Sequence, residues 1–130
     1  MIRRLAPLAL LLATAAAPPA MMDVAPAPAA SPLLLNSADD ARLVCGERVD
    51  VAKQLACVSW LNGAYQIATR YQSLSPQLFP DSCPPAGAAP LGRQRELLLA
   101  WLAANPGERV SPALLAYRKA MAAAFPCPPG

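Results

Sequence analysis

Four cysteines constrain this chain more than any other feature, because no histidine accompanies them. They stand at Cys45, Cys57, Cys83 and Cys127, and no two of them are close together in the sequence. A zinc site made of cysteine alone needs closely spaced pairs of ligands, and a redox-active pair needs a C-x-x-C motif. An even number of widely spaced cysteines is typical of a disulfide framework. The sequence therefore predicts no metal site, and nothing in it indicates a cofactor.

Four cysteines can form disulfides in three combinations. We favour Cys45–Cys57 together with Cys83–Cys127, because the first would join two neighbouring helices across a short connection. The second would fasten a proline-rich loop to the end of the last helix. Loop-closure entropy gives roughly 3 kcal/mol for the shorter loop and roughly 4 kcal/mol for the longer one. These are large fractions of a domain stability of about 5–15 kcal/mol, so we expect the fold to require oxidation.

The first twenty residues have the pattern of a secretory signal peptide. Met1–Arg4 carries two arginines, Leu5–Ala17 is apolar, and two prolines follow. A membrane-spanning helix needs roughly 20 apolar residues, so this run is too short to be an anchor. We expect residues 1–20 to be removed on export. The mature chain is then predicted to be free of the membrane, either in an oxidising envelope compartment or outside the cell.

The charge balance of the mature chain excludes one class of partner. The full chain has 11 basic and 8 acidic residues, and residues 1–20 contain two of the basic and none of the acidic ones, which leaves nine against eight. Nucleic-acid binding relies on clustered lysine and arginine, so we expect no nucleic-acid partner. Residues 21–36 are rich in alanine and proline and predict a flexible lead-in. One domain is expected over residues 37–130.

That domain has the hydrophobic periodicity of helices, so we predict an all-α fold, a small bundle of about four helices with two disulfides. The first helix is expected from Ser37, in a capping box with Asp40, to about Cys45. The second is expected to follow Asp50 as its N-cap and to reach about Gln72. Its predicted apolar face consists of Val51, Leu55, Val58, Leu61, Tyr65 and Ala68.

Proline and asparagine mark the later helices. The third helix is predicted from about Pro90 to Ala104, where Asn105–Gly107 ends it. Ser111, followed by a proline, is the predicted N-cap of the fourth helix, which should stop at Pro126.

Three residues inside the helices also have predicted packing roles. We expect Trp60 and Trp101 to lie in the core rather than in a contact surface. Gly63 is expected where two helices approach closely, because a mid-helix glycine costs about 1 kcal/mol relative to alanine.

The cysteines and their neighbours resemble the Rap/Tai family of immunity proteins. The motifs that carry the resemblance are Cys45, Cys57–Gly63, Cys83–Pro85, Trp101–Pro106 and Phe125–Cys127. The resemblance covers essentially all of Ser37 to Cys127. It implies a small, helical, disulfide-bonded periplasmic protein, often homodimeric, that inhibits a type VI-secreted amidase acting on peptidoglycan peptide cross-bridges. The sequence departs from the family at Trp60, where tyrosine is commoner.

Catalysis by this chain is not expected. Without histidine, a free cysteine or a G-x-S-x-G motif, the sequence offers no pair of nucleophile and base. Ser59 and Ser111 have no base nearby in the sequence. We therefore predict no catalytic residue and expect the protein to act by binding.

The proline-rich loop from Ser73 to Pro90 is the predicted contact surface, because a stiff loop with apolar anchors loses little entropy on binding. We expect it to enter or cover the active-site cleft of the amidase. The alternative is that its apolar side chains fold back onto the core. A second predicted surface is Asn105–Val110. The residues predicted to touch the partner are Leu74, Gln77, Leu78, Phe79, Asp81, Glu108 and Arg109.

A different function remains open at this point. The same stapled helical domain could serve as a structural or assembly protein of the cell envelope, since a fold does not dictate a function. The two hypotheses differ in whether the chain has an amidase partner.

Overall fold

The computed structural model describes residues 34–71 and 80–129. In chain order the elements are α1 (Ala38–Gly46), α2 (Val51–Arg70), α3 (Leu91–Ala104), the 3-10 helix η1 (Pro106–Val110) and α4 (Ala113–Ala124). Apart from these helices, the described ranges contain two isolated antiparallel bridges. The predicted all-α class with four helices is therefore confirmed.

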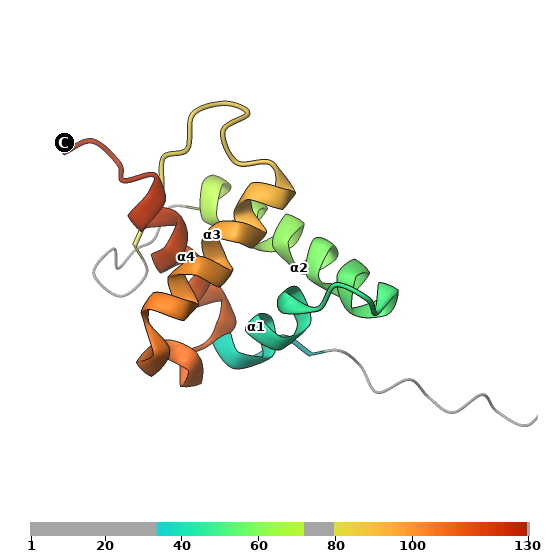
Figure 1. The fold of residues 1–130 in the computed structure, drawn as a ribbon. Helices are drawn as coiled ribbons and strands as arrows, with labels where there is room; N and C mark the ends of the chain where they lie inside the picture. The colour runs from blue at the N-terminus through green and yellow to red at the C-terminus, as the bar shows by residue number, and fades with distance from the viewer. Residues whose placement is uncertain (1–33, 72–79, 130) are drawn as a thin grey trace, which may run out of the picture. The chain divides into compact units, whose positions relative to one another are not determined.

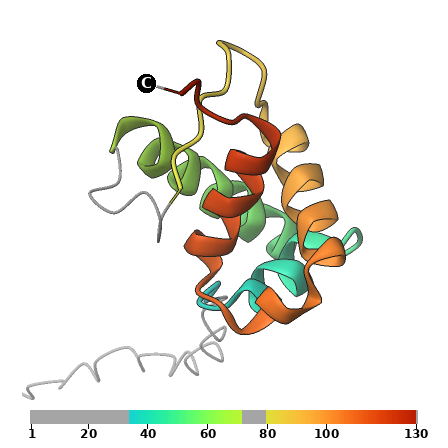
Figure 2. The same ribbon diagram turned by 90° about the vertical axis from the view of Figure 1, so that its left-hand side faces the viewer.

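The helices are arranged around one hairpin. α3 and α4 run antiparallel, are joined by η1 and make the most extensive contact between helices (Figure 1). α1 packs against α2, α3 and α4, and α2 crosses behind the hairpin (Figure 2). None of the helices in the described ranges combines the length and the apolar character of a membrane span.

Both ends of α1 are held by side chains. At its start the Asp40 amide donates to the Ser37 hydroxyl (3.1 Å), and the Ser37 amide donates to the Asp40 carboxylate (2.9 Å). This confirms the predicted capping box. At its end the Arg95 guanidinium, from α3, donates to the carbonyl oxygens of Cys45 (2.6 Å) and Glu47 (2.7 Å). A cation there also suits the negative end of the helix dipole.

α2 begins as predicted but turns a different face to the core. The Asp50 carboxylate accepts from the amides of Ala52 and Lys53, which confirms this N-cap. The buried residues of the helix are Cys57, Leu61, Ala64 and Ala68.

The apolar face predicted for α2 is partly wrong. Val51, Leu55 and Val58 are 75%, 65% and 42% exposed. The physical reason is the disulfide from Cys57 to Cys45, which turns Cys57 inward and so places the residues four, seven and eleven positions later on the buried side.

The core combines a few large side chains with many alanines. Its largest fully buried members include Tyr117, Leu61, Leu98, Leu102 and Met121. Small residues between them let the helices approach closely. Both tryptophans, expected in the core, are partly buried and pack against its edge. The Trp60 ring meets the Tyr117 ring edge to face, with centroids 5.8 Å apart.

A buried polar chain ties α3 to α4. The Tyr117 hydroxyl donates to the Gln94 side-chain oxygen (2.8 Å), and the Gln94 nitrogen donates to the Ala89 carbonyl (2.7 Å). Burial raises the pKa of the Tyr117 phenol far above its usual value. The hydroxyl therefore stays neutral and keeps its hydrogen bond, and neither polar group is left unsatisfied in the core.

The N-cap predicted at Ser111 is wrong. α4 has Pro112 as its N-cap and makes no side-chain capping bond. The Ala113 amide donates instead to the Asn36 carbonyl (2.8 Å), so the chain entering α1 supplies a first-turn acceptor. The Ser111 hydroxyl is then free to donate to the Glu108 carboxylate (2.6 Å).

The reason predicted for Gly63 is also wrong. Gly63 is exposed, and no atom of a neighbouring element lies within 4 Å of the position that a Cβ would take. No close helix approach explains this glycine.

Both predicted disulfides are confirmed. The sulfur atoms are 2.04 Å apart in Cys45–Cys57 and 2.02 Å apart in Cys83–Cys127. The first bridge is buried in the core between α1 and α2, where its cysteines are 0% and 1% exposed. The second joins the exposed Cys83 to the half-buried Cys127 beyond the end of α4.

Candidate partner-binding surface

Four of the predicted contact residues, namely Leu74, Gln77, Leu78 and Phe79, lie outside the described residues. Their role stays a prediction. The structure does describe the segment Pro80–Pro90 that follows them.

The beginning of that segment is fixed to α4. The Asp81 carboxylate pairs with the Arg118 guanidinium at 2.6 Å, and this arginine, 6% exposed, also donates to the Pro80 carbonyl (3.3 Å). An arginine buried to this degree needs an anionic partner. Asp81, which is predicted to touch the partner, therefore also has a structural role as the anionic partner of Arg118.

The next two residues are held by the chain beyond α4. Ser82 forms an antiparallel bridge with Pro126, and the Cys83 amide donates to the Phe125 carbonyl (2.9 Å). The Cys83–Cys127 disulfide lies beside this bridge. Together these bonds hold the end of the predicted contact loop rigidly.

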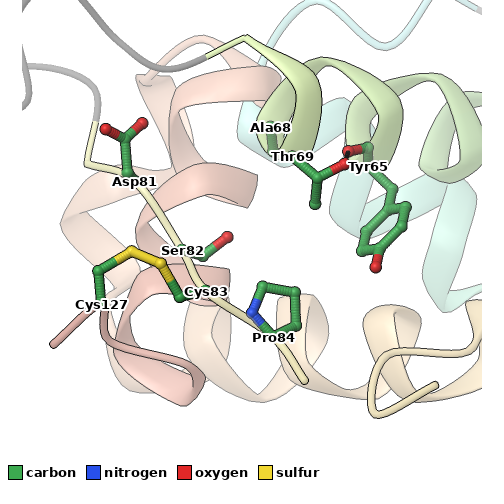
Figure 3. A pocket seen from close by; sticks show the side chains of 8 residues that line it. All are labelled: Tyr65, Ala68, Thr69, Asp81, Ser82, Cys83, Pro84 and Cys127. Carbon is green, nitrogen blue, oxygen red and sulfur yellow. Dashed lines mark hydrogen bonds between the residues drawn. A yellow bond between two sulfur atoms is a disulfide. The ribbon is translucent and has the colours of Figure 1, made fainter. Parts of the chain in front are cut away.

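A pocket of about 280 Å³ lies between this braced segment and the second half of α2 (Figure 3). Its walls are formed by Tyr65, Ala68, Thr69, Asp81, Ser82, Cys83, Pro84 and Cys127. The Ser82 side chain points from the segment toward α2 (Figure 3). Its hydroxyl oxygen is buried and has no hydrogen-bond partner among the groups that the structure describes.

The second predicted surface lies at the other end of the α3–α4 hairpin. η1 joins the two helices at one end, while the segment that begins at Asp81 meets the opposite end (Figures 1 and 2). The structure thus does not bring Glu108 and Arg109 together with Asp81.

Of the two predicted contact residues in η1, Glu108 makes hydrogen bonds within the fold. The Glu108 carboxylate accepts from Lys119 (2.8 Å) and Ser111 (2.6 Å), and these hydrogen bonds lower its pKa, with that from Lys119 contributing most. Arg109 and Val110 are exposed. Arg109 is therefore the better placed of the two to meet a partner.

Part of the apolar face that the sequence predicted to be buried forms an exposed surface on α2. Val51, Leu55 and Val58 follow each other at spacings of four and three, so they share one side of the helix. Continuing the same spacing leads to Tyr65 and Thr69, which line the pocket. Helical spacing identified these residues as one face of the helix, but not that this face lies toward solvent.

The described carboxylates are occupied in structural roles. Asp40 and Asp50 cap helices, while Asp39, Asp81, Glu47, Glu96 and Glu108 pair with basic side chains. No group of three potential metal ligands gathers anywhere in ranges 34–71 and 80–129. The described surface is therefore suited to recognising a partner through its shape, apolar contacts and hydrogen bonds.

Comparison with known proteins connects this scaffold to a family. A family model described as Rap1a immunity proteins matches residues 37–127. No curated protein and no solved structure shows a significant match. The matched range includes all four helices and all four cysteines, so the resemblance carried by the cysteine motifs is confirmed.

Proposed function

This chain belongs to the Rap1a immunity protein family, and on that premise we propose that it is a periplasmic, non-enzymatic inhibitor of a type VI-secreted peptidoglycan amidase. The observation that carries the proposal is the family match over residues 37–127, because that range contains the whole disulfide-bonded helical bundle. The signal-peptide pattern of residues 1–20 and the two disulfides support an oxidising envelope compartment.

The proline-rich loop is the proposed contact with the amidase. Its described end is anchored by Arg118, by the Ser82–Pro126 bridge and by the outer disulfide. A loop anchored in this way can present apolar side chains with little loss of entropy on binding. We place the inhibitory contact at residues 73–90, with the exposed Arg109 in a secondary contact.

A homodimer is also part of this proposal. The stripe formed by Val51, Leu55 and Val58 leaves apolar side chains in water on one side of α2. Contiguous exposed apolar surface is a common mark of protein–protein contacts. Two copies meeting through α2 would cover the stripe.

Co-expression with an amidase tests the function directly. The probe is a type VI-secreted peptidoglycan amidase, taken from an adjacent reading frame where one encodes it, and directed to the periplasm of a host that lacks its own inhibitor. We expect the full chain to restore growth and to co-purify with the amidase. A chain without residues 1–20 should accumulate in the cytoplasm and give no protection, which serves as the control. Growth arrest despite secreted inhibitor would favour an envelope structural role.

The loop contact is tested within the same system. Phe79→Ala should weaken the complex at least tenfold, because truncation of an anchor residue at a binding hot spot costs about 2 kcal/mol or more. Its melting temperature should stay unchanged if the side chain faces the partner. A dissociation constant equal to that of the parent protein would place the contact elsewhere.

A further inference from the structure

Two features of the pocket beside α2 bear on whether it binds a ligand. Its volume of about 280 Å³ is just below the roughly 300–1,000 Å³ typical of small-molecule sites, and it suits a single side chain. Its wall includes Ser82, which is 9% exposed and whose hydroxyl lacks a hydrogen-bond partner in the described structure. Buried polar groups in native proteins nearly always have a hydrogen-bond partner, so we expect a bound group to supply one for this hydroxyl.

The hydrogen-bonding character of the wall defines that occupant. A serine hydroxyl can donate one hydrogen bond and accept others. The Thr69 hydroxyl donates its hydrogen to the Tyr65 carbonyl (2.8 Å), so its oxygen remains able to accept. An occupant with both an acceptor and a donor can therefore pair with Ser82 and Thr69 together.

The charges around the pocket favour a neutral occupant. Asp81 lines the wall, but its carboxylate already pairs with the buried Arg118 at 2.6 Å. A carboxylate ligand would lie near Asp81 without a cation of its own. An ammonium ligand would have to compete with Arg118, whose burial makes the existing pair costly to break.

We propose that this pocket holds one neutral amide group, carried by an asparagine or glutamine side chain of the bound protein partner, with Ser82 as its hydrogen-bond partner. A carboxamide supplies one acceptor and two donors without charge. The identity of the partner as an amidase rests on the proposed function, whereas the preference of the pocket for an amide does not.

The pocket is formed before any partner arrives. One wall is a helix, and the other is fixed by the outer disulfide, the Cys83–Phe125 hydrogen bond and the Arg118 contacts. A preformed site requires little ordering on binding. A small amide should therefore bind to the free protein, although weakly.

Small probes test the chemistry without any partner. The oxidised protein is titrated with propionamide, propionate and propylammonium while its backbone amide signals are followed by NMR. We expect a saturable shift of the Ser82, Cys83 and Thr69 signals with propionamide alone. Absence of a saturable shift, as when an ordered water satisfies Ser82, would overturn the proposal. A response to either charged probe in place of the amide would overturn it as well.

Three variants locate the binding. Ser82→Ala should weaken propionamide roughly two- to tenfold, about the effect of one lost neutral hydrogen bond, while its melting temperature stays equal or rises by a few degrees. Thr69→Trp, at an exposed position on the rim, should block the pocket. Gln66→Trp, at an exposed position of the same helix outside the lining, is the matched control and should bind propionamide normally. Normal binding by both Ser82→Ala and Thr69→Trp would refute the site.

A complex with the amidase separates the two proposals. If the parent protein inhibits the amidase and Ser82→Ala binds it at least tenfold less tightly, both stand. Equal inhibition by Ser82→Ala and the parent would remove the pocket from the interface and leave the proposed function intact. Saturable binding of propionamide without any binding of the amidase would retain the amide site and reject the proposed partner.

Discussion

At the scale of single residues, the glycines illustrate how local conformation sets stability. Gly63 lies within α2 and faces open space, whereas Gly87 lies in a turn with a φ of +75°. A helix-interior glycine has more backbone freedom to lose than alanine. A left-handed φ, by contrast, is strained for any residue with a Cβ.

The two glycines therefore predict opposite effects of the same substitution. Gly63→Ala should stabilise the protein by about 1 kcal/mol, the difference in helix propensity. Gly87→Ala should destabilise it by about 1 kcal/mol because of backbone strain. Urea denaturation of the oxidised protein measures both. A loss of stability in Gly63→Ala would mean that this glycine has a packing role after all.

Residue-scale features could be predicted where their causes are local. The caps at Ser37 and Asp50 act within three positions of themselves, so sequence spacing was enough. The cap expected at Ser111 failed because its place is taken by the carbonyl of Asn36, which is remote in sequence. The position of Gly63 in open space likewise depends on where the other helices lie.

At the scale of elements, α2 has apolar residues on more than one side. Its buried side follows Cys57, while Val51, Leu55 and Val58 lie in solvent. Periodicity identified the helix but not its rotation, because a helix with scattered apolar residues has no single obvious face. The disulfide to Cys45 supplies the missing constraint.

The exposed stripe of α2 predicts how the dimer can be separated. Leu55→Asp, at a site 65% exposed, should raise the dimer dissociation constant at least tenfold by placing a charge in an apolar contact. The stability of the monomer should change by no more than about 0.5 kcal/mol, as is usual for surface positions. Gln66→Asp, also exposed on α2, serves as the control. Sedimentation of the parent protein as a monomer at micromolar concentration would contradict this arrangement.

At the scale of the whole molecule, the pocket shows which parts of a site escape sequence reasoning. Tyr65 and Thr69 belong to α2, while Ser82 lies within the loop that follows it, and the outer disulfide adds the chain end at Cys127. The sequence motifs predicted both the disulfide and the loop. They could not predict that the loop end and α2 enclose a hollow, because this depends on how α2 packs against the rest of the bundle.

The two disulfides differ in accessibility, which predicts an order of reduction. Cys45 and Cys57 are buried, whereas Cys83 is exposed, and thiol–disulfide exchange requires the attacking thiolate to reach a sulfur. Mild dithiothreitol should therefore reduce Cys83–Cys127 first and leave Cys45–Cys57 intact. Alkylation of the freed thiols followed by peptide mass mapping identifies the reduced pair.

Loss of the outer bridge should weaken the molecule in a defined way. Opening a closed loop of 44 residues removes about 4 kcal/mol of stability on the chain-entropy estimate. The paired variant Cys83→Ser/Cys127→Ser should show this loss in urea denaturation and should bind the amidase less tightly, since the contact loop loses an anchor. Simultaneous reduction of both bridges would contradict the predicted order of reduction. Full inhibition by the paired variant would show that the outer disulfide does not hold the contact surface in place.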